Sequence, residues 1–444
     1  MNIPSLRVCL FTFAVLLLTS SLSMADNIER ISVSSNGVEG NSDSGYFAWG
    51  YNVNISSFSR YIIYVSMASN LVTGDSNGFP GIFLRDRELG TTELVDLSSS
   101  GVQGNNSAYP VGVSEDGRFV SYGSRASNLV TDDTNGSFDI FVRDRKLGTT
   151  ERVSLSSAGT QLATGSTATA SMSRDGRFVA FSSSSSDAVA GDTNNAVDIF
   201  VRDRELGTTV RVSVASDGTQ AIGPSINPTI SGNGKFVGFS SSASNLVQDD
   251  TNGVTDFFVH NLETGATERV NVASDGTQAN AYNGPVPLMT ISNDGRFVVF
   301  PSAASNLVSD DTNGLLDIFV RDRELGLTQR VSIASDGTQG NGGVSYQGAI
   351  SADGRFVTFG SSASNLITGD TNGIMDIFIF DRSLNETRRV STASDGSQPN
   401  NASALPTISA DGKTVIFPST ATNLVIGDTN GRWDVFAVDL NTCY

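Results

Sequence analysis

A short loop pattern, Asp-x-Asn-Gly-x-x-Asp, recurs along this chain and carries the residue types most able to do chemistry. In one copy, Asp250, Asn252 and Asp256 place three oxygen-bearing side chains at positions one, three and seven of the loop. Carboxylate and amide oxygens on a tightly turned loop are ligands that Ca²⁺ prefers. The pattern predicts a calcium site in each of six loops. The predicted ligand sets are Asp133, Asn135 and Asp139; Asp192, Asn194 and Asp198; Asp250, Asn252 and Asp256; Asp311, Asn313 and Asp317; Asp370, Asn372 and Asp376; and Asp428, Asn430 and Asp434.

The same residues also fit a turn that needs no metal. Asp and Asn side chains close turns onto nearby backbone N–H groups, glycine supplies the left-handed residue, and the last Asp can hold the backbone of the strand that follows. A full calcium loop also contains a further acid and a bidentate Glu, which this pattern lacks. Both interpretations stay open. A seventh, earlier copy has Asp75 and Asn77 but Gly81 in place of the last Asp, so the weakest metal binding is predicted there.

These loops belong to a repeat that runs almost the whole length of the chain. Their first Asp residues, from Asp75 to Asp428, are separated by 58, 59, 58, 61, 59 and 58 residues. A period held this closely indicates one supersecondary unit stacked on copies of itself. Each unit contains two apolar runs joined by Asp-Gly, a long loop, a third run and a glycine turn into a fourth, which predicts a four-stranded antiparallel meander.

The two ends of the chain predict how the ring of repeats closes. The last copy stops after its third strand, Asp434 to Asp439, and has no fourth. The segment Glu29 to Ser34 matches the fourth-strand text Glu268 to Ala273. We therefore predict an all-β fold, a seven-bladed β-propeller of four-stranded antiparallel blades, closed by an N-terminal strand that completes the last blade.

The amino-acid sequence of the repeat resembles that of a known family. Ile350 to Ser361 reads Ile-Ser-x-Asp-Gly-Arg-Phe-Val-x-Phe-x-Ser, and Asp317 to Asp322 reads Asp-Ile-Phe-Val-Arg-Asp. Both are similar to the TolB-type (WD40-like) propeller repeat, over residues 29 to 439. The resemblance implies the propeller fold and a secreted or periplasmic protein. It implies little about function, because such propellers include scaffolds, peptidase-associated domains and lyases.

The repeat breaks its symmetry at a few aromatic residues and at one histidine. His260 replaces the first arginine of the recurring Val-Arg-Asp-Arg on a third strand. Because this position lies away from the channel mouth, we favour a replacement without catalytic function over a general base. No Ser-His-Asp set and no His/Cys zinc cluster is present in the sequence, and no catalytic residue is predicted. The aromatic residues fall in the loops that lead from a fourth strand to the next first strand, where they fit either a ligand-binding rim or packing between blades: Tyr46, Trp49, Tyr109, Tyr282 and Tyr346.

The first 25 residues read as a secretory signal rather than as part of the fold. Arg7 supplies positive charge, Val8 to Leu18 is almost entirely apolar, and Ser23 and Ala25 are small residues at the positions that a signal peptidase reads. We expect cleavage before Asp26, a propeller from residue 26 to residue 444, and a secreted or periplasmic location. The apolar run is too short to span a bilayer.

The net charge and the position of the long loops indicate which partners are favoured and where they bind. The formal net charge of −18 disfavours nucleic acid and anionic membranes and favours cations. In a propeller, the loop from strand two to strand three and the loop from strand four to the next strand one emerge on one face, which here carries the long loops. We predict a non-catalytic scaffold that binds a protein or glycan partner on that face, with Ca²⁺ ordering the loops. The alternative is a polysaccharide lyase using a Tyr base with Arg support at the channel mouth.

Overall fold

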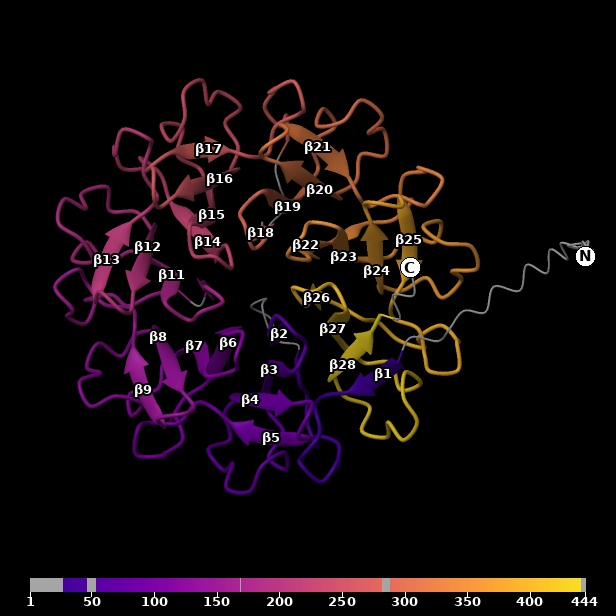
Figure 1. Ribbon diagram of the computed structural model, residues 1–444, viewed down its shortest axis with the longest axis horizontal. Coiled ribbons are helices and arrows are strands. Elements are labelled where there is room, and N and C mark those ends of the chain that lie inside the picture. The colour runs from indigo at the N-terminus through magenta and orange to yellow at the C-terminus, as the bar shows by residue number, and fades with distance from the viewer. Residues whose placement is uncertain (1–26, 46–52, 168, 282–287, 441–444) are drawn as a thin grey trace, which may run out of the picture.

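The computed structural model describes residues 27–45, 53–167, 169–281 and 288–440 and shows a ring of seven four-stranded antiparallel sheets. Figure 1 looks down the axis of this ring. Blade one contains β2 (Val53–Ile55), β3 (Tyr61–Ser66), β4 (Gly81–Asp86) and β5 (Thr91–Leu94); blade two β6 (Ala108–Val113), β7 (Phe119–Ser124), β8 (Asp139–Asp144) and β9 (Thr149–Arg152); blade three β10 (Ala170–Met172), β11 (Phe178–Ser183), β12 (Asp198–Asp203) and β13 (Thr208–Arg211); and blade four β14 (Ser225–Ile230), β15 (Phe236–Ser241), β16 (Asp256–Asn261) and β17 (Thr267–Arg269). Blade five contains β18 (Thr290–Ile291), β19 (Phe297–Ser302), β20 (Asp317–Asp322) and β21 (Leu327–Arg330); blade six β22 (Val344–Ile350), β23 (Phe356–Ser361), β24 (Asp376–Asp381) and β25 (Glu386–Arg389); and blade seven β26 (Thr407–Ile408), β27 (Thr414–Ser419), β28 (Asp434–Asp439) and β1 (Asn27–Arg30).

Blade seven joins the two ends of the described chain. Its sheet has the order β1-β28-β27-β26, so the outermost strand comes from the N-terminal side. The pairing of β1 with β28 is antiparallel and runs from Asn27 opposite Asp439 to Arg30 opposite Phe436. The predicted seven-bladed propeller and its closure by an N-terminal strand are therefore confirmed. The predicted signal segment lies outside the described residues.

Paired aromatic rings mark the middle of each blade. Strands two and three place one ring each at the same register position, with ring centroids 5.7–6.2 Å apart. Such pairs contribute about 0.5–1.5 kcal/mol each beyond the area they bury. The pairs are Tyr64–Phe83, Tyr122–Phe141, Phe181–Phe200, Phe239–Phe258, Phe300–Phe319, Phe359–Phe378 and Phe417–Phe436.

The hydrophobic core lies between blades and not inside any one of them. One cluster joins Ile63 and Leu84 of blade one to Val120 and Phe141 of blade two, all of them at most 1% exposed. Equivalent clusters fill the other blade junctions, including the junction of blade seven with blade one. This arrangement explains why the strand sequences are apolar on both faces, since each sheet packs against two neighbours.

The Asp-Gly turns are required both by backbone conformation and by packing. Gly295, between β18 and β19, has a φ of +80°, and a Cβ atom there would lie 2.1 Å from the Phe236 ring of the preceding blade. Asp294 closes the turn, because its Oδ1 accepts hydrogen bonds from Ser292 Oγ at 2.6 Å and from the N–H of Arg296 at 3.0 Å. The glycine turns between strands one and two of blades two to seven all fit against an aromatic ring of the preceding blade.

Repeated arginines form ion pairs both within and between blades. In blade five, Arg296 donates to Asp322 within the blade, with Nη2 to Oδ2 at 2.7 Å. Arg323 reaches the preceding blade, where its Nε donates to Glu268 at 2.7 Å and its guanidinium lies 4.6 Å from the Phe236 ring centroid. The same contacts link blade to blade around much of the ring.

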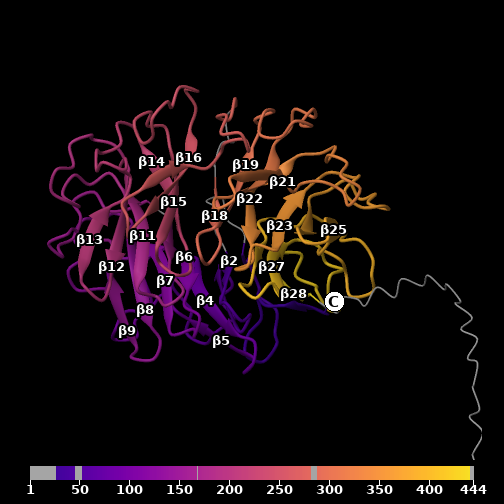
Figure 2. The same ribbon diagram turned by 45° about the horizontal axis from the view of Figure 1, so that its top comes forward.

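The ring has two unlike faces, and Figure 2 shows it obliquely. The turn face carries the tight turns between strands one and two and between strands three and four, such as Asp116-Gly117 and Lys146 to Gly148. The long-loop face carries the Asp-Thr-Asn-Gly loops and the loops that lead from one blade to the next. No helix long and apolar enough to cross a membrane occurs in the described residues.

Candidate functional site

The first predicted metal loop, in blade two, is closed by its own side chains. Asp139 begins β8 and is fully buried, and its Oδ1 accepts a hydrogen bond from Ser154 Oγ at 2.6 Å. Asn135 turns its amide nitrogen inward, 3.5 Å from Asp139 Oδ2, and donates to the Leu162 carbonyl at 2.9 Å. The amide oxygen of Asn135 accepts the N–H of Ser137 at 2.8 Å. The loop thus uses its Asn as a turn residue, as the metal-free interpretation requires.

An arginine stands between the two carboxylates of this loop. Arg152, from the end of β9, places Nη1 3.7 Å from Asp133 Oδ1 and 3.6 Å from Asp139 Oδ2. Its side chain is 3% exposed and the two carboxylates are 2% and 0% exposed, so the charges face one another away from solvent. Burial raises the pKa of Asp139, and the Ser154 hydroxyl and the Arg152 guanidinium oppose that rise. The guanidinium supplies the positive charge that a metal was predicted to supply.

An arginine faces the two carboxylates in all six of the predicted metal loops. It comes in each case from the fourth strand of the blade, where the sequence reads Arg-Val-Ser in most copies. The calcium sites stay a prediction, and the structure adds to each ligand set a cation that sequence reasoning did not place there. The groups are Arg152 with Asp133 and Asp139, Arg211 with Asp192 and Asp198, Arg269 with Asp250 and Asp256, Arg330 with Asp311 and Asp317, Arg389 with Asp370 and Asp376, and Arg30 with Asp428 and Asp434.

A glutamine ties the loop between strands two and three to the next loop on the long-loop face in blades one to six, and Glu39 takes its place in blade seven. Gln278 Oε1 accepts the N–H groups of Thr251 and Asn252, both at 3.2 Å. Its Nε2 donates to the Asp249 carbonyl at 2.7 Å and to Thr251 Oγ1 at 3.0 Å. One side chain therefore holds two loops of blade four together, and Gln339 and Gln398 repeat these contacts in blades five and six.

Asparagine pairs then join one blade to the next on the same face. The N–H of Asn280, in blade four, donates to Asn306 Oδ1 of blade five at 3.0 Å. Asn306 Nδ2 donates in return to the Gln278 carbonyl at 2.8 Å. The Asn of each Ala-Ser-Asn-Leu segment recurs in this role at several junctions. In the described residues these bonds join neighbouring loops of the long-loop face into one hydrogen-bonded network.

A shallow cleft of about 480 Å³ lies between the two loops of blade four on this face. Hydroxyl and amide side chains line it, and Gly276 leaves one side free of a side chain. The cleft is lined by Thr251, Asn252, Gly276, Thr277, Gln278, Ala279 and Asn280. Blade five repeats this text as Thr312-Asn313 and Gly337-Thr338-Gln339 followed by Asn341.

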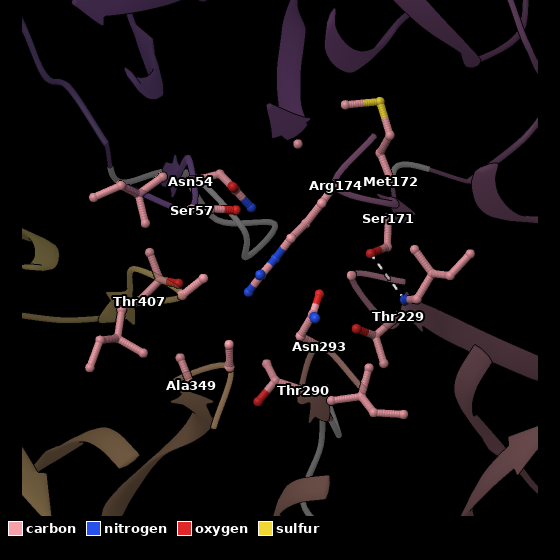
Figure 3. Close-up of a pocket in the computed structure, with 18 of the residues that line it drawn as sticks. Asn54, Ser57, Ser171, Met172, Arg174, Thr229, Thr290, Asn293, Ala349 and Thr407 are labelled. Carbon is pink, nitrogen blue, oxygen red and sulfur yellow. Dashed lines mark hydrogen bonds between the residues drawn. The ribbon is translucent and has the colours of Figure 1, made fainter. Parts of the chain in front are cut away.

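The innermost strands enclose a central channel of about 190 Å³ (Figure 3). Small polar side chains dominate its wall, namely Asn54, Ser171, Thr229, Thr290 and Thr407. Ser171 is occupied in the fold, because its Oγ accepts the N–H of Ile230 at 3.1 Å. The channel is narrow and polar, and its wall is nearly uniform from blade to blade.

Arg174 breaks that uniformity at the turn-face end of the channel. Figure 3 shows its side chain extending into the ring near Asn293. Both side chains crowd Gly232, since a Cβ there would lie 2.1 Å from Asn293 Oδ1 and 2.8 Å from Arg174 Nε. Burial lowers the pKa of Arg174, and the charges of Glu115 and Asp411 oppose that change. Sequence reasoning missed this residue, although it stands where other copies carry Glu, Gly, Asn or Ala before Asp-Gly or Asn-Gly.

His260 has a structural role in the described fold. It stands on β16 at the place of Arg143 in blade two, is 6% exposed, and its Nδ1 lies 2.8 Å from Thr267 Oγ1. Arg143 makes the equivalent contact with Thr150 at 3.2 Å. Burial lowers the pKa of His260. The replacement therefore keeps a hydrogen bond of the repeat.

The predicted aromatic rim divides into two groups. Tyr109, on β6, is half-buried and stacks on Phe138 of the same blade, with ring centroids 6.2 Å apart. It packs against the hydrophobic cluster between blades two and three. Tyr46, Trp49 and Tyr282 lie outside the described residues, and so does the side chain of Tyr346. A ligand-binding role for these four residues stays a prediction.

The chain is similar in fold to solved propeller structures. An oligogalacturonate lyase in complex with manganese matches with a TM-score of 0.54 and 12% identity, over 95% of each chain. The propeller domain of the Trilobed protease from Pyrococcus furiosus, described as having an open velcro topology, matches with a TM-score of 0.51 and 10% identity, over 89% of this chain and 96% of that one. At these identities the likeness shows the fold alone.

TolB from Acinetobacter baumannii is a more distant match. Its TM-score is 0.39 and its identity 15%, over 82% of this chain and 76% of that one. No family model matches the sequence, and no curated protein matches it either. The propeller architecture that the TolB-type resemblance implied is shown by the seven four-stranded sheets of the structure itself.

Proposed function

We propose that this protein is a non-catalytic binding propeller that holds an uncharged glycan chain on its long-loop face. The observation that carries the proposal is the cleft of blade four, which presents hydroxyl and amide groups on a surface whose own hydrogen bonds are already made. Side chains of these types match the donors and acceptors of sugar hydroxyls. A protein surface is the other kind of partner that such a polar face accepts.

Because the cleft is repeated in neighbouring blades, several weak contacts with one polymer can add up to a higher overall affinity. Blades four, five and six carry nearly the same lining text, with Thr-Asn in one loop and Gly-Thr-Gln or Gly-Ser-Gln in the other. A polymer that occupies one cleft is held close to the next, so each further contact forms at high effective concentration. A glycan chain, which repeats its own units, suits a surface of repeated sites better than a single small molecule does.

The charge and the N-terminal sequence support a location outside the cytoplasm and an uncharged ligand. The secretory pattern of the first 25 residues is the basis for proposing a secreted or periplasmic protein. The net charge of −18 repels acidic polymers over the whole surface. We therefore place neutral polysaccharides first among the ligands to be tested.

The test fills the cleft and keeps the Gln278 and Gln339 bonds that join the two loops. Thr277→Tyr and Thr338→Tyr place a ring over the clefts of blades four and five, and Thr264→Tyr is the matched control at an exposed turn on the turn face. Binding to a panel of neutral polysaccharides is measured by affinity electrophoresis. We expect the double variant to bind at least roughly ten-fold more weakly, since two linked contacts are lost. Equal loss in the control, or no loss in the double variant, would contradict the proposal.

A lyase is the second candidate, and Arg174 is the observation that favours it. In the described residues no carboxylate lies within ion-pair distance of this guanidinium, which projects into the channel. A lyase removes a proton beside a sugar carboxylate and expels the glycosidic oxygen, and a cation near the carboxylate assists that step. Incubation with acidic polysaccharides, followed by detection of unsaturated chain ends, tests this activity. Arg174→Ala should abolish it if it exists, and absence of product across the panel would retire the candidate.

A further inference from the structure

Blade one departs from the other six blades at three positions that meet in one place. Gly81 stands at the start of β4, where the others have Asp; Leu94 stands at the end of β5, where the others have Arg; and Asp96 stands two residues later, where the others have Ser or Asn. In blade two the corresponding residues are Asp139, Arg152 and Ser154. The carboxylate has moved from one strand to the next, and the arginine has been lost.

The backbone around these positions is unchanged. The N–H of Ile82 donates to Asp96 Oδ1 at 2.9 Å, and the N–H of Ile140 in blade two donates to Ser154 Oγ at 3.1 Å. Asp96 Oδ1 therefore occupies the place of the serine oxygen. Gly81 makes this substitution sterically acceptable, because a Cβ there would lie 3.3 Å from Asp96 Oδ1 and 3.1 Å from a methyl group of Leu94.

The second oxygen of Asp96 has no partner in the protein. Asp96 is 0% exposed, and its Oδ2 is buried without a hydrogen bond. Gly104 packs close by, since a Cβ there would lie 3.5 Å from Oδ2 and 3.3 Å from the Ala126 methyl group. An unpartnered buried carboxylate oxygen is costly, and it is the kind of group that binds a cation or a water molecule.

A second acid, Asp75 of the loop between β3 and β4, lies near Asp96. Asp75 is close enough that its charge raises the pKa of Asp96, and its own Oδ1 accepts a hydrogen bond from Gln103 Nε2 at 2.8 Å. In the other six blades two carboxylates share one guanidinium, whereas in blade one two carboxylates have none. The acid pair of blade one therefore lacks the buried guanidinium that the corresponding pairs of the other blades contact.

We propose that a divalent cation of the calcium class binds between Asp75 and Asp96, in the place that an arginine guanidinium takes in the other six blades. Asp96 Oδ2 and the Asp75 carboxylate are its protein ligands, and water completes the coordination, because Ca²⁺ accepts several oxygen ligands in flexible geometry. The loop sequence predicted the weakest metal site in blade one, and the missing arginine reverses that order.

The test converts blade one to the pattern of its neighbours. The triple variant Gly81→Asp, Leu94→Arg and Asp96→Ser reproduces blade two and supplies the guanidinium, so it should fold and lose the cation. Equilibrium dialysis of the mature protein against Ca²⁺, with Mg²⁺ and Na⁺ as separate arms, measures the number of bound ions. We expect the triple variant to bind one Ca²⁺ fewer per chain than the unmodified protein. Asp132→Asn, which removes an exposed carboxylate on the same face, is the matched control and should bind the full number.

Leu94→Arg alone provides a second variant if the triple change disturbs folding. It keeps both carboxylates and adds only the guanidinium, and circular dichroism verifies that the sheets are intact. We expect it, too, to lose one Ca²⁺ per chain. Equal Ca²⁺ numbers in the unmodified protein and in both variants would overturn the proposal, and so would the absence of binding in all three ionic arms. Additional ions retained by the variants would support the separate prediction of calcium in the other six loops and leave this one standing.

Discussion

Blades one and two share the same backbone arrangement but differ in whether an arginine neutralises their two carboxylates. In blade two, Arg152 lies between Asp133 and Asp139, and all three side chains are almost fully buried. In blade one, Asp75 and Asp96 meet at the same level of the fold, and Leu94 stands where the arginine would be. The hydrogen bond that begins the third strand is kept in both blades.

This difference teaches that the repeat preserves a shape more strictly than it preserves a charge balance. The N–H at the start of the third strand must be satisfied because it is buried, and either a serine or a carboxylate oxygen satisfies it. The negative charge of the buried carboxylates can be neutralised independently of this hydrogen bond, either by an arginine from the same blade or by an ion from solution. A departure from the repeat is therefore informative when it removes a partner and leaves its charge behind.

The largest effect is expected from making blade two resemble blade one. Arg152→Leu leaves Asp133 and Asp139 buried without their cation, and breaking such a group by removing one partner costs roughly 3–5 kcal/mol. Unfolding in guanidinium chloride, with Ca²⁺ chelated, measures the loss of stability. A change below about 1 kcal/mol would mean that the arginine is dispensable, and the comparison between the two blades would lose its energetic basis.

A pH series tests the other side of the comparison. Asp96→Asn keeps the acceptor for the N–H of Ile82 but cannot ionise. Because burial raises the native pKa of Asp96 from 3.8 to about 7, the protonated acid favours the fold below pH 3.8, and that contribution is lost as the pH rises to about 7. In chelator, the variant should therefore gain stability relative to the unmodified protein across this interval, by about 4 kcal/mol at most.

Thermal or denaturant unfolding at several pH values between 4 and 8 measures this gain, and Ca²⁺ in place of chelator should reduce it, because a bound cation stabilises the ionised form. A difference between variant and unmodified protein that does not change with pH would show that Asp96 is ionised throughout. The assignment of a raised pKa to this group would then be wrong.

The smallest effect concerns a feature that the two blades share. Asn70 of blade one accepts the N–H of Asn41 at 2.9 Å and donates to the Glu39 carbonyl at 2.9 Å. Asn128 of blade two makes the same pair of bonds, at 2.9 and 2.8 Å, to the N–H of Asn105 and to the Gln103 carbonyl. Asn70→Ala and Asn128→Ala should each cost about 1–2 kcal/mol, because two hydrogen bonds are lost at each junction. Equal values from denaturant unfolding would confine the difference between the blades to the acid sites, and unequal values would extend it to the junctions.

The sequence carried enough information for the architecture. The period of 58 to 61 residues predicts the repeated blade, and Asp-Gly between apolar runs predicts its hairpins. The fourth-strand sequence found at the beginning of the chain, and missing at its end, predicts how the ring closes. The structure confirms that closure in the pairing of β1 with β28. These features are local or periodic, and local signals are the ones that a sequence displays directly.

The candidate site was only half visible in the sequence. The Asp and Asn residues of the loops were found, because they lie within seven residues of one another, but the arginines that face them were not. Arg152 follows Asp133 by 19 positions and arrives from another strand. Arg174 escaped notice for a similar reason, since its meaning comes from the channel that seven separate strands enclose.

The sequence by itself therefore determined the ring, the number of blades, the closing strand and the face that carries the long loops. Tertiary structure alone decided which acids are neutralised within the protein and which are not. The physical reason is that backbone pattern follows from turn chemistry and alternation along a few residues, whereas the energy of a buried charge depends on whatever other strands bring within a few ångströms of it. In blade one those strands bring a leucine and a second acid, and in the other blades they bring an arginine.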